Sequence, residues 1–393
     1  MIAWRRNLFA VTAVSFIGFT GFTLVMPFLP LYIRQLGVSD VGEIALWAGV
    51  SLGVTPAVNA LVSPFWGRLA DRFGRKIMVV RSLAACVFAM GAMAFVTRPW
   101  HVFGLRAMLG LLTGYGGLTV TMAAESAPPE SVPVAIGTVQ TAQRLGPAVG
   151  PVIGGVLAGL VGLRIAFIVT AALYAAALVL VLVLYDDNAT HTQPKHTSDR
   201  GRVSFRNVLA FENFLLLMFV VFSIQFVDRS FGPVLPLFIE QRGIAAARVP
   251  VLAGTLFSLV AIAGALGHHF CARLLKRFSP RVVISAGATA ACVGTIVVAA
   301  ADSIWLMGGA MIVFGAGIGA AMTAAYSAAA SLIPAGVHGT GFGVLTSASL
   351  IGMAVSPVVA GLLGSTSIRG VFIVDAATMA IVALLIRRKM IEG

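Results

Sequence analysis

The chain has 393 residues, of which 59% are hydrophobic and only 10% are charged, and its mean hydropathy is +0.98. This composition excludes a soluble globular domain, and its apolar runs of about 20 residues are each long enough to span a membrane. The formal charge of +13 comes from Lys and Arg in the short gaps between those runs, so it indicates topology and contact with anionic lipids and argues against nucleic acid as a partner.

Twelve apolar runs fill nearly the whole chain, and we expect each of them to be a transmembrane helix. The first six are predicted at residues 8–33, 44–66, 78–97, 101–124, 135–158 and 164–185. The second six are predicted at residues 210–239, 249–271, 281–300, 304–330, 341–363 and 368–388. The predicted fold class is therefore an all-α membrane protein. Two six-helix bundles, at 1–185 and 208–393, are joined by a polar, cytosolic linker at 186–207.

Lys and Arg are distributed unequally between the two ends of these helices. Of the 27, 18 lie at one set of ends, six at the opposite set and three inside helices. Since cytosolic loops carry the excess of basic residues, both termini are expected to be cytosolic. The first apolar run is expected to be a retained helix, because no small-residue cleavage site follows it. We expect a monomer in a bacterial plasma (inner) membrane.

An internal repeat with an offset of 205 to 206 residues relates the two halves. The matched pairs include Pro27 and Pro233, Pro30 and Pro236, Gly37 and Gly243, Gly146 and Gly352, Pro151 and Pro357, and Gly155 and Gly361. Because every pair keeps the offset, chance alignment of apolar sequence is a poor explanation. Two parallel halves, related by an axis along the membrane normal, are typical of one class of secondary transporter.

A dense group of charges separates the second and third predicted helices. Residues 67–76 read Gly-Arg-Leu-Ala-Asp-Arg-Phe-Gly-Arg-Lys and hold five of the 41 charged side chains. Such a segment cannot lie in lipid, so we expect a short connection at the membrane surface. Gly67 and Gly74 are expected to allow close backbone approach and a tight turn. Asp71 can accept hydrogen bonds from a helix N-terminus or an arginine.

A basic membrane anchor would explain the arginines of this segment, but not its acid and its two glycines. A conformational latch explains all of these features. The candidate latch residues are Gly67, Asp71, Arg72, Gly74 and Arg75. The matching stretch at 272–281 keeps the arginines, but lysine replaces the acid and serine the second glycine. The latch is therefore expected in the first half only.

The fifth predicted helix carries glycines around a proline. These residues are Gly137, Gly146, Gly150, Pro151, Gly154 and Gly155. Gly146, Gly150 and Gly154 are spaced by four, so they share one face and are expected to let another helix approach closely. Pro151 removes one backbone hydrogen bond and is expected to bend the helix.

These motifs resemble those of the major facilitator superfamily, and in particular its twelve-helix drug:proton antiporter branch. The charged segment resembles the superfamily's signature between helices 2 and 3, and the glycines of helix 5 resemble its antiporter signature at every defined position. Gly21 to Pro30 and Arg106 to Gly114 resemble further motifs of that branch. The resemblance implies alternating access around a central cavity, a bend in helix 5 that distinguishes exporters, and a coupling role for Arg106. The loop after helix 4 departs from the pattern, because it lacks the usual arginine.

Charged side chains inside the predicted helices mark candidate sites for a proton or a substrate. Asp228 lies near mid-membrane if Glu240 marks the outer interface, because the intervening helix spans about 18 Å. A deep carboxylate can bind and release a proton as its surroundings change; the alternative is a buried structural pair with an arginine of another helix. Gln225 lies one turn earlier. Arg229 points about 100° away from Asp228, so it is expected to need another partner.

The first half offers arginines instead of a deep acid. Arg144 is expected about 13 Å inside helix 5, with Gln140 one turn before it, and it suggests an anionic substrate group or a carboxylate of the other half as partner. Arg106 is expected to be shallower and to extend partly towards the surface. Asp375 in helix 12 is expected to be a structural partner of Arg229.

The predicted function is secondary active export of a small molecule, drug-like or a metabolite, by alternating access coupled to proton antiport. Helix 1 has no carboxylate, which several proton-coupled relatives carry there, so coupling is expected to fall to Asp228. The alternative is an importer or facilitator of a nutrient or metabolite with the same fold. An enzyme is not expected, because the sequence lacks clustered nucleophiles, paired carboxylates and a His-rich metal set. Neither a cofactor nor a metal is expected, and the expected partners are the substrate, protons and membrane lipids.

Overall fold

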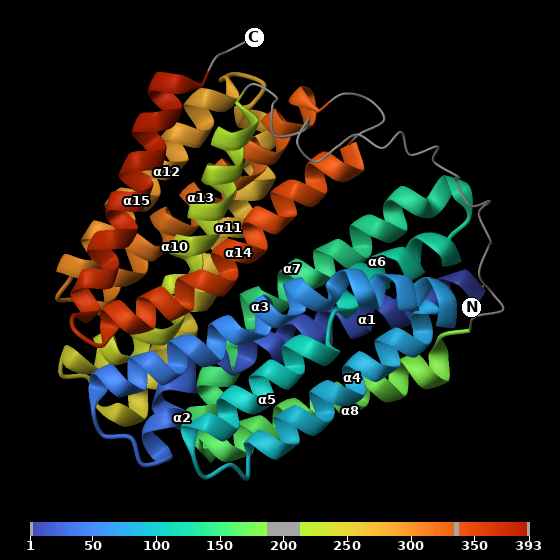
Figure 1. The fold of residues 1–393 in the computed structure, drawn as a ribbon, viewed down its shortest axis with the longest axis horizontal. Coiled ribbons are helices and arrows are strands. Elements are labelled where there is room, and N and C mark those ends of the chain that lie inside the picture. Colours follow the sequence, from blue (N-terminus) through green and yellow to red (C-terminus); the bar gives the residue numbers. More distant parts are fainter. Residues whose placement is uncertain (1–2, 187–212, 334–337, 391–393) are drawn as a thin grey trace. The chain divides into compact units, whose positions relative to one another are not determined.

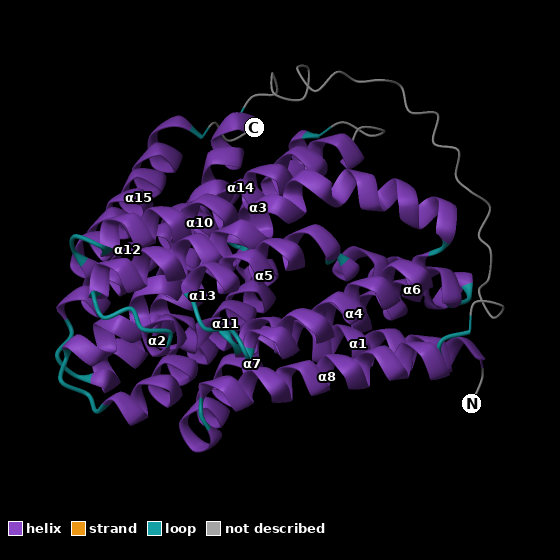
Figure 2. Cartoon of the chain, turned by 60° about the horizontal axis from the view of Figure 1, so that its bottom comes forward, coloured by secondary structure: helices purple, strands orange, loops and turns teal. Residues whose placement is uncertain are grey.

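The computed structural model describes residues 3–186, 213–333 and 338–390, and every regular element within them is a helix (Figure 1). The first half contains α1 (Ala3–Leu24), η1 (Met26–Phe28), α2 (Leu29–Gln35), α3 (Val41–Phe73), α4 (Arg75–Met93), α5 (Pro99–Leu112), α6 (Tyr115–Ser126), η2 (Pro129–Ser131), α7 (Val132–Val161) and α8 (Leu163–Leu184). The second half contains α10 (Phe214–Gln241), η4 (Ala246–Arg248), α11 (Val249–Leu274), α12 (Pro280–Ala300), α13 (Ile304–Leu332), α14 (His338–Gly364) and α15 (Ile368–Lys389). Short loops join them (Figure 2).

Twelve segments of the described chain are long and apolar enough to cross a membrane, and each overlaps one of the predicted runs. The first segment combines α1, η1 and α2, and the fourth combines α5 and α6. The predicted fold class, an all-α protein with twelve membrane-spanning helices, is therefore confirmed.

The helices form two compact units. Unit 1 consists of Met1–Ser39, Val54–Lys195 and Ile239–Ser258, and unit 2 consists of Asp40–Gly53, His196–Phe238 and Leu259–Gly393. Each unit thus combines most helices of one half of the sequence with a short segment of the other half. The predicted boundaries at 1–185, 186–207 and 208–393 stay a prediction, because the linker lies outside the described residues except for Asp186.

In unit 1, α1 packs against α6, α7 and α8, and α4 packs against α5 and α8. The ring of Phe167 lies 5.5 Å from that of Phe28 and 4.8 Å from that of Tyr32, between centroids. The buried Tyr32 hydroxyl donates a hydrogen bond to the carbonyl oxygen of Met93. These contacts join α2, α4 and α8 at one end of the unit.

In unit 2, α12 packs against α13 and α15, and α14 packs against α13 and α15. Aromatic side chains connect three of the helices: the ring of Phe231 in α10 lies 5.0 Å from Phe314 in α13 and 5.4 Å from Phe372 in α15.

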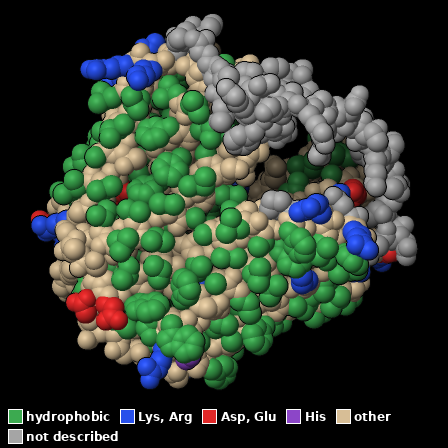
Figure 3. All heavy atoms as spheres, viewed as in Figure 1, with side chains coloured by type: hydrophobic (Ala, Val, Ile, Leu, Met, Phe, Trp, Pro, Cys, Tyr) green, Lys and Arg blue, Asp and Glu red, His purple; other side chains and the backbone are tan. Residues whose placement is uncertain are grey.

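Large apolar side chains cover the outside of the helices in both units, as Figure 3 shows in green. Leu61, Phe95 and Trp305 are among the exposed ones. A surface of this kind fits lipid rather than water.

Two predicted helices are interrupted. The first changes at Val25 to a 3₁₀ turn that contains Pro27 and resumes as α2, with Pro30 in its first turn. The fourth breaks between α5 and α6, where Gly114 has a φ of +137°. Proline and glycine explain both breaks: proline cannot donate the helical hydrogen bond, and glycine tolerates a positive φ without a Cβ clash.

The prediction of a short connection at residues 67–76 is wrong in its extent. Helix α3 continues through Phe73, ten residues beyond the membrane-spanning segment that ends at Ser63, and only Gly74, with a φ of +92°, separates it from α4. A helix satisfies its own backbone hydrogen bonds, so charged residues can extend it into water beyond the lipid. Gly74 therefore forms the expected turn. Gly67 lies inside the helix, and a Cβ added there would meet no atom within 4 Å, so it allows no close approach.

Candidate functional site

The glycines of α7 form a seam against α1. A Cβ added at Gly146 would lie 2.7 Å from the backbone nitrogen of Thr20, and one added at Gly150 would lie 2.7 Å from the carbonyl oxygen of Thr20. One added at Gly154 would lie 2.7 Å from the carbonyl carbon of Leu24. Side-chain carbons normally stay about 3.5 Å from such atoms. The three glycines therefore let the two helices approach closely, as their spacing predicts.

Gly155 faces α11 instead. A Cβ added there would lie 3.1 Å from the Cα of Val251, and one added at Gly254 would lie 3.3 Å from the Cα of Gly155. Unit 2 repeats this contact at the offset of the sequence repeat: a Cβ at Gly361 in α14 would lie 3.2 Å from the Cα of Gly49 in α3. In each unit, a helix with an internal proline is thus joined by glycines to the start of a helix from the other half of the sequence.

Pro151 lies inside the continuous helix α7. The next backbone N–H, at Val152, donates a hydrogen bond to the hydroxyl oxygen of Ser258 in α11, at 3.2 Å. Gly137, at the other end of the motif, is exposed, and a Cβ added there would meet no atom within 4 Å. It therefore does not belong to the glycine seam.

Arg106 lies in the middle of α5 and is only 1% exposed. Its Nε and Nη2 atoms have no hydrogen-bond partner among the described residues. The expectation that this side chain extends to the surface is wrong, because α5 turns it towards the interior of unit 1. Thr55 of α3 donates a hydrogen bond to its backbone carbonyl at 2.9 Å. A buried guanidinium without an acid is costly, so Arg106 remains a functional candidate.

Arg144 lies near the middle of α7 and is exposed, as is Gln140 one turn before it. Within the described part of the chain Arg144 makes no hydrogen bond or ion pair. Because an unpaired guanidinium at mid-helix is unfavourable in lipid, it requires water or an anionic partner. Arg106 is buried, so it does not share a surface with Arg144 and Gln140.

Asp228 lies at the middle of α10, and its side chain is 24% exposed. The Nε atom of Arg229 lies 3.4 Å from its Oδ2 atom. The long side chain of Arg229 therefore bends back to its neighbour, and the expectation that it also needs another partner stays a prediction. A partly exposed carboxylate held by one guanidinium can exchange that partner for a proton or a cationic group.

Polar side chains of three helices meet beside Asp228 in unit 2. Gln225, one turn earlier on α10, donates a hydrogen bond to the hydroxyl of Ser349 in α14, at 3.0 Å. The hydroxyl of Tyr326 in α13 lies close to the hydroxyls of Thr346 and Ser349 in α14. We call Gln225, Asp228, Arg229, Tyr326 and Ser349 the α10 polar group. Sequence reasoning found its members on α10 and missed Tyr326 and Ser349, although a tyrosine in the Ala-rich α13 was a usable signal.

Asp375 in α15 is 1% exposed, and its Oδ2 atom lies 2.5 Å from the hydroxyl oxygen of Ser230 in α10. Its Oδ1 atom has no hydrogen-bond partner among the described residues. The expected pairing of Asp375 with Arg229 is therefore not found. Ser230, the residue after Arg229 on α10, is the partner of Asp375 instead.

The basic residues after Gly74 bind other helices of unit 1. Arg75 forms an ion pair with Glu125 near the end of α6, a partner that sequence reasoning missed. Lys76 donates a hydrogen bond to the carbonyl oxygen of Tyr185, directly after α8, at 2.6 Å. Arg72 is exposed and lies over the ring of Phe73. The backbone of Asp71 is helical, and its side chain lies outside what the structure describes.

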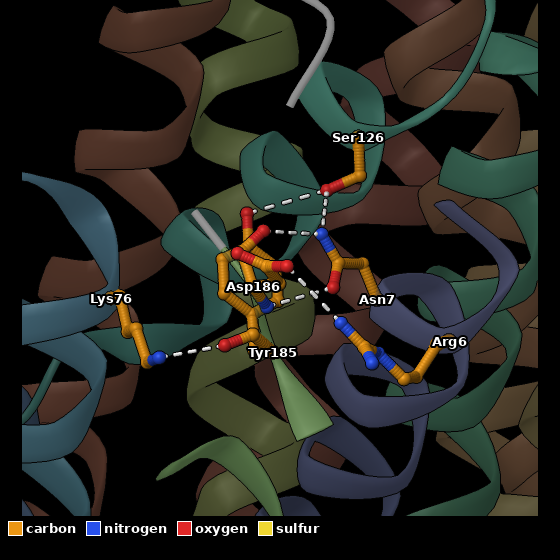
Figure 4. A network of polar contacts seen from close by, with 6 residues as sticks. All are labelled: Arg6, Asn7, Lys76, Ser126, Tyr185 and Asp186. Carbon is orange, nitrogen blue, oxygen red and sulfur yellow. Dashed lines mark hydrogen bonds and ion pairs between the residues drawn. The ribbon is translucent and has the colours of Figure 1, made fainter. Parts of the chain in front are cut away.

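A network of polar contacts continues from Lys76 to the start of the chain (Figure 4). We call its members Arg6, Asn7, Lys76, Ser126, Tyr185 and Asp186 the Asp186 cluster. Asn7 donates a hydrogen bond to the backbone carbonyl of Asp186 at 2.8 Å and accepts one from its N–H at 2.9 Å. Arg6 forms an ion pair with the Asp186 carboxylate at 3.2 Å. The cluster thus fixes the end of α8, where the described part of the first half ends.

Comparison with known proteins places the chain in a family. The family model described as "Major Facilitator Superfamily" matches residues 217–390. A protein of Lactococcus lactis subsp. lactis, named "Multi-drug resistance efflux pump PmrA homolog", is 30% identical over 362 residues, which cover 91% of this chain and 88% of that protein. This chain belongs to the Major Facilitator Superfamily. It is therefore a transmembrane transporter, and the predicted family is confirmed.

Other members of the superfamily agree with this assignment. "Multidrug resistance protein MdtG" of Proteus mirabilis is 29% identical over 320 residues, covering 81% of this chain and 79% of that one. A bacterial homolog of the human lysosomal transporter Spinster has the same fold, with a TM-score of 0.79, 17% identity and coverage of 99% and 98%. The nucleoside transporter NupG gives a TM-score of 0.75 at 15% identity, with coverage of 98% and 100%. At such low identities these structures support the fold alone.

Proposed function

We propose that this superfamily member exports small molecules in exchange for protons. The observation that carries the proposal is Asp228, a partly exposed carboxylate in the middle of α10 with Arg229 as its neighbour at 3.4 Å. Two relatives with about 30% identity carry names that refer to multidrug efflux or resistance, which favours export over uptake. The glycine seam of α7, which resembles the antiporter motif, adds to this support.

Antiport requires that the proton and the substrate bind alternately. When Asp228 is ionised, Arg229 balances its charge, and the α10 polar group can accept a substrate. When Asp228 takes up a proton, the carboxyl is neutral and the guanidinium of Arg229 loses that partner, so the same group favours a different state. A pH gradient of one unit supplies about 1.4 kcal/mol per proton, enough for about tenfold accumulation of substrate.

Arg144 points to part of the substrate class. It is an exposed guanidinium at mid-helix without a described partner, and Gln140 offers a neutral hydrogen-bonding group one turn away. We infer that Arg144 and Gln140 bind an anionic or strongly hydrogen-bonding end of the substrate. Arg106, buried in α5, acts as a coupling residue in this proposal rather than as a direct contact.

The orientation and the latch complete the proposal. Both termini face the cytosol, because the ends of the helices on that side carry 18 of the 27 basic residues. Asp71 acts with Gly67, Arg72, Gly74 and Arg75 as a conformational latch on that side, and the ion pair of Arg75 with Glu125 ties the start of α4 to α6. The protein works as a monomer in the plasma membrane.

The test uses purified protein in liposomes with an imposed pH gradient. Asp228→Asn should abolish uphill transport and retain substrate binding and downhill exchange, because the amide keeps the shape of the side chain but cannot titrate. The matched control is Glu130→Gln, which removes an exposed carboxylate from the connection before α7. It should transport like the wild type.

Undiminished uphill transport by Asp228→Asn would remove this residue from the mechanism. Wild-type transport that runs only downhill and ignores the pH gradient would instead favour an importer or facilitator.

A further inference from the structure

A second acid lies on the opposite side of α10 from the α10 polar group. Asp375 of α15 and Ser230 of α10 are each 1% exposed. Ser230 follows Asp228 by two residues, so its side chain points about 200° around the helix from Asp228. Phe231 and Phe372, whose ring centroids lie 5.4 Å apart, pack beside the pair. Asp375 is therefore a carboxyl group in an apolar contact between two helices.

The protonation state of Asp375 decides which acceptor receives the single hydrogen of the Ser230 hydroxyl. The hydroxyl oxygen of Ser230 lies 2.5 Å from Oδ2 of Asp375 and 2.9 Å from the carbonyl oxygen of Val227. Both neighbours are acceptors when Asp375 is ionised, yet a serine hydroxyl has a single hydrogen to donate. An ionised Asp375 takes that hydrogen and leaves Val227 without it. A protonated Asp375 donates to Ser230, and Ser230 then donates to Val227.

No charge on the surrounding helices neutralises Asp375. Helices α10, α12 and α14 pack against α15. Their titratable groups are Asp228, Arg229 and Glu240 of α10 and Arg281 and Cys292 of α12, and α14 has none between Gly341 and Gly364. Helix α15 itself adds Arg369 and its basic last turn. Among the described residues, Ser230 alone makes a hydrogen bond or ion pair with Asp375. A buried ionised carboxylate without a cation is expensive, so the pair favours binding a proton.

We propose that Asp375 and Ser230 form a second proton-binding site, at which Asp375 gains and loses a transported proton. On release, the proton leaves Oδ2 for the aqueous phase, and the Ser230 hydroxyl turns from Val227 to the carboxylate. On uptake, the reverse rearrangement restores the bond to Val227. The inference rests on the proposed proton antiport. It adds that α10 responds to two acids: Asp228 on one face, whose protonation the exchange requires, and Asp375 on the other, which carries one more proton per cycle.

The transport test compares Asp375→Asn with the wild type in liposomes at a fixed pH gradient. The amide can donate to Ser230 as the protonated acid does, so the variant should fold, bind substrate and exchange it downhill. It should accumulate about tenfold less substrate for each unit of the pH gradient, because one proton per cycle is lost. Accumulation equal to that of the wild type overturns the proposal. If the wild type itself shows no uphill transport, the proposed proton antiport is wrong, and the second proton-binding site is overturned with it.

An infrared measurement separates this site from transport and from folding of the Asp375 variant. Difference spectra of the wild type between acid and alkaline pH should contain a carboxylic-acid C=O band that shifts in Ser230→Ala. The matched control is Ser223→Ala, which removes another buried hydroxyl of α10, one without a hydrogen-bond partner among the described residues. It should leave the band unchanged. A band that is insensitive to Ser230→Ala, or that shifts equally in both variants, overturns the proposed site.

Discussion

Replacement of Gly154 by alanine tests the glycine seam of α7. The added Cβ would lie 2.7 Å from the carbonyl carbon of Leu24, which belongs to the backbone of α1 and cannot rotate away. Normal contact needs about 3.5 Å, and the carbonyl oxygen of Leu24 is nearer still, so α1 and α7 would have to separate by more than about 0.8 Å. Overpacking of this kind costs about 1–3 kcal/mol. A loss of 1 kcal/mol lowers the melting temperature by about 2–4 °C in a domain of 150–250 residues.

The assay is thermal unfolding of the purified protein in detergent, followed by intrinsic tryptophan fluorescence. Gly137→Ala is the matched control, since it changes another glycine of the same motif and the same helix where a Cβ meets nothing within 4 Å. It should leave stability unchanged or raise it by up to about 1 kcal/mol, because alanine favours helix. Equal melting temperatures of Gly154→Ala and Gly137→Ala would refute the close approach of α1 and α7.

Two further predictions concern polar groups. Asn7→Ala should destabilise the protein by about 1–3 kcal/mol, because it removes the two hydrogen bonds that this side chain makes with the backbone of Asp186. The control is Thr12→Ala, because the Thr12 hydroxyl of α1 has no hydrogen-bond partner among the described residues. In the same unfolding assay it should have little effect. Equal losses of stability in the two variants would contradict the role of the Asp186 cluster. Arg144→Gln should change stability by less than about 0.5 kcal/mol but weaken binding of anionic compounds by about tenfold. Binding assays in which the affinity for cationic compounds falls equally would contradict this.

The sequence was sufficient to predict the membrane architecture. Twelve apolar runs of sufficient length leave little choice of fold, since lipid requires that every backbone hydrogen bond be made inside the helix. The spacing of Gly146, Gly150 and Gly154 also predicted a close helix contact, because residues four apart share one face. The partner, α1, was not predictable, because the spacing specifies a face and not what covers it.

Other features depended on information that the local pattern does not contain. Charged residues from Arg68 to Arg72 are compatible with a loop or with a solvated helix, so the length of α3 was underestimated. Helix α5 is apolar on all sides, which left the rotation of Arg106 undetermined. Contacts such as Gln225 with Ser349 join positions far apart in the chain, and no local spacing encodes them.

Proton movement driven by substrate is the most direct test of the account. Wild-type protein is placed in liposomes without a pH gradient, a substrate gradient is imposed across the membrane, and the internal pH is followed with a trapped dye. If the protein exchanges substrate for protons, substrate that enters the liposomes should make their interior more alkaline, and a protonophore should remove the signal. Substrate flux with no change of internal pH would contradict proton antiport.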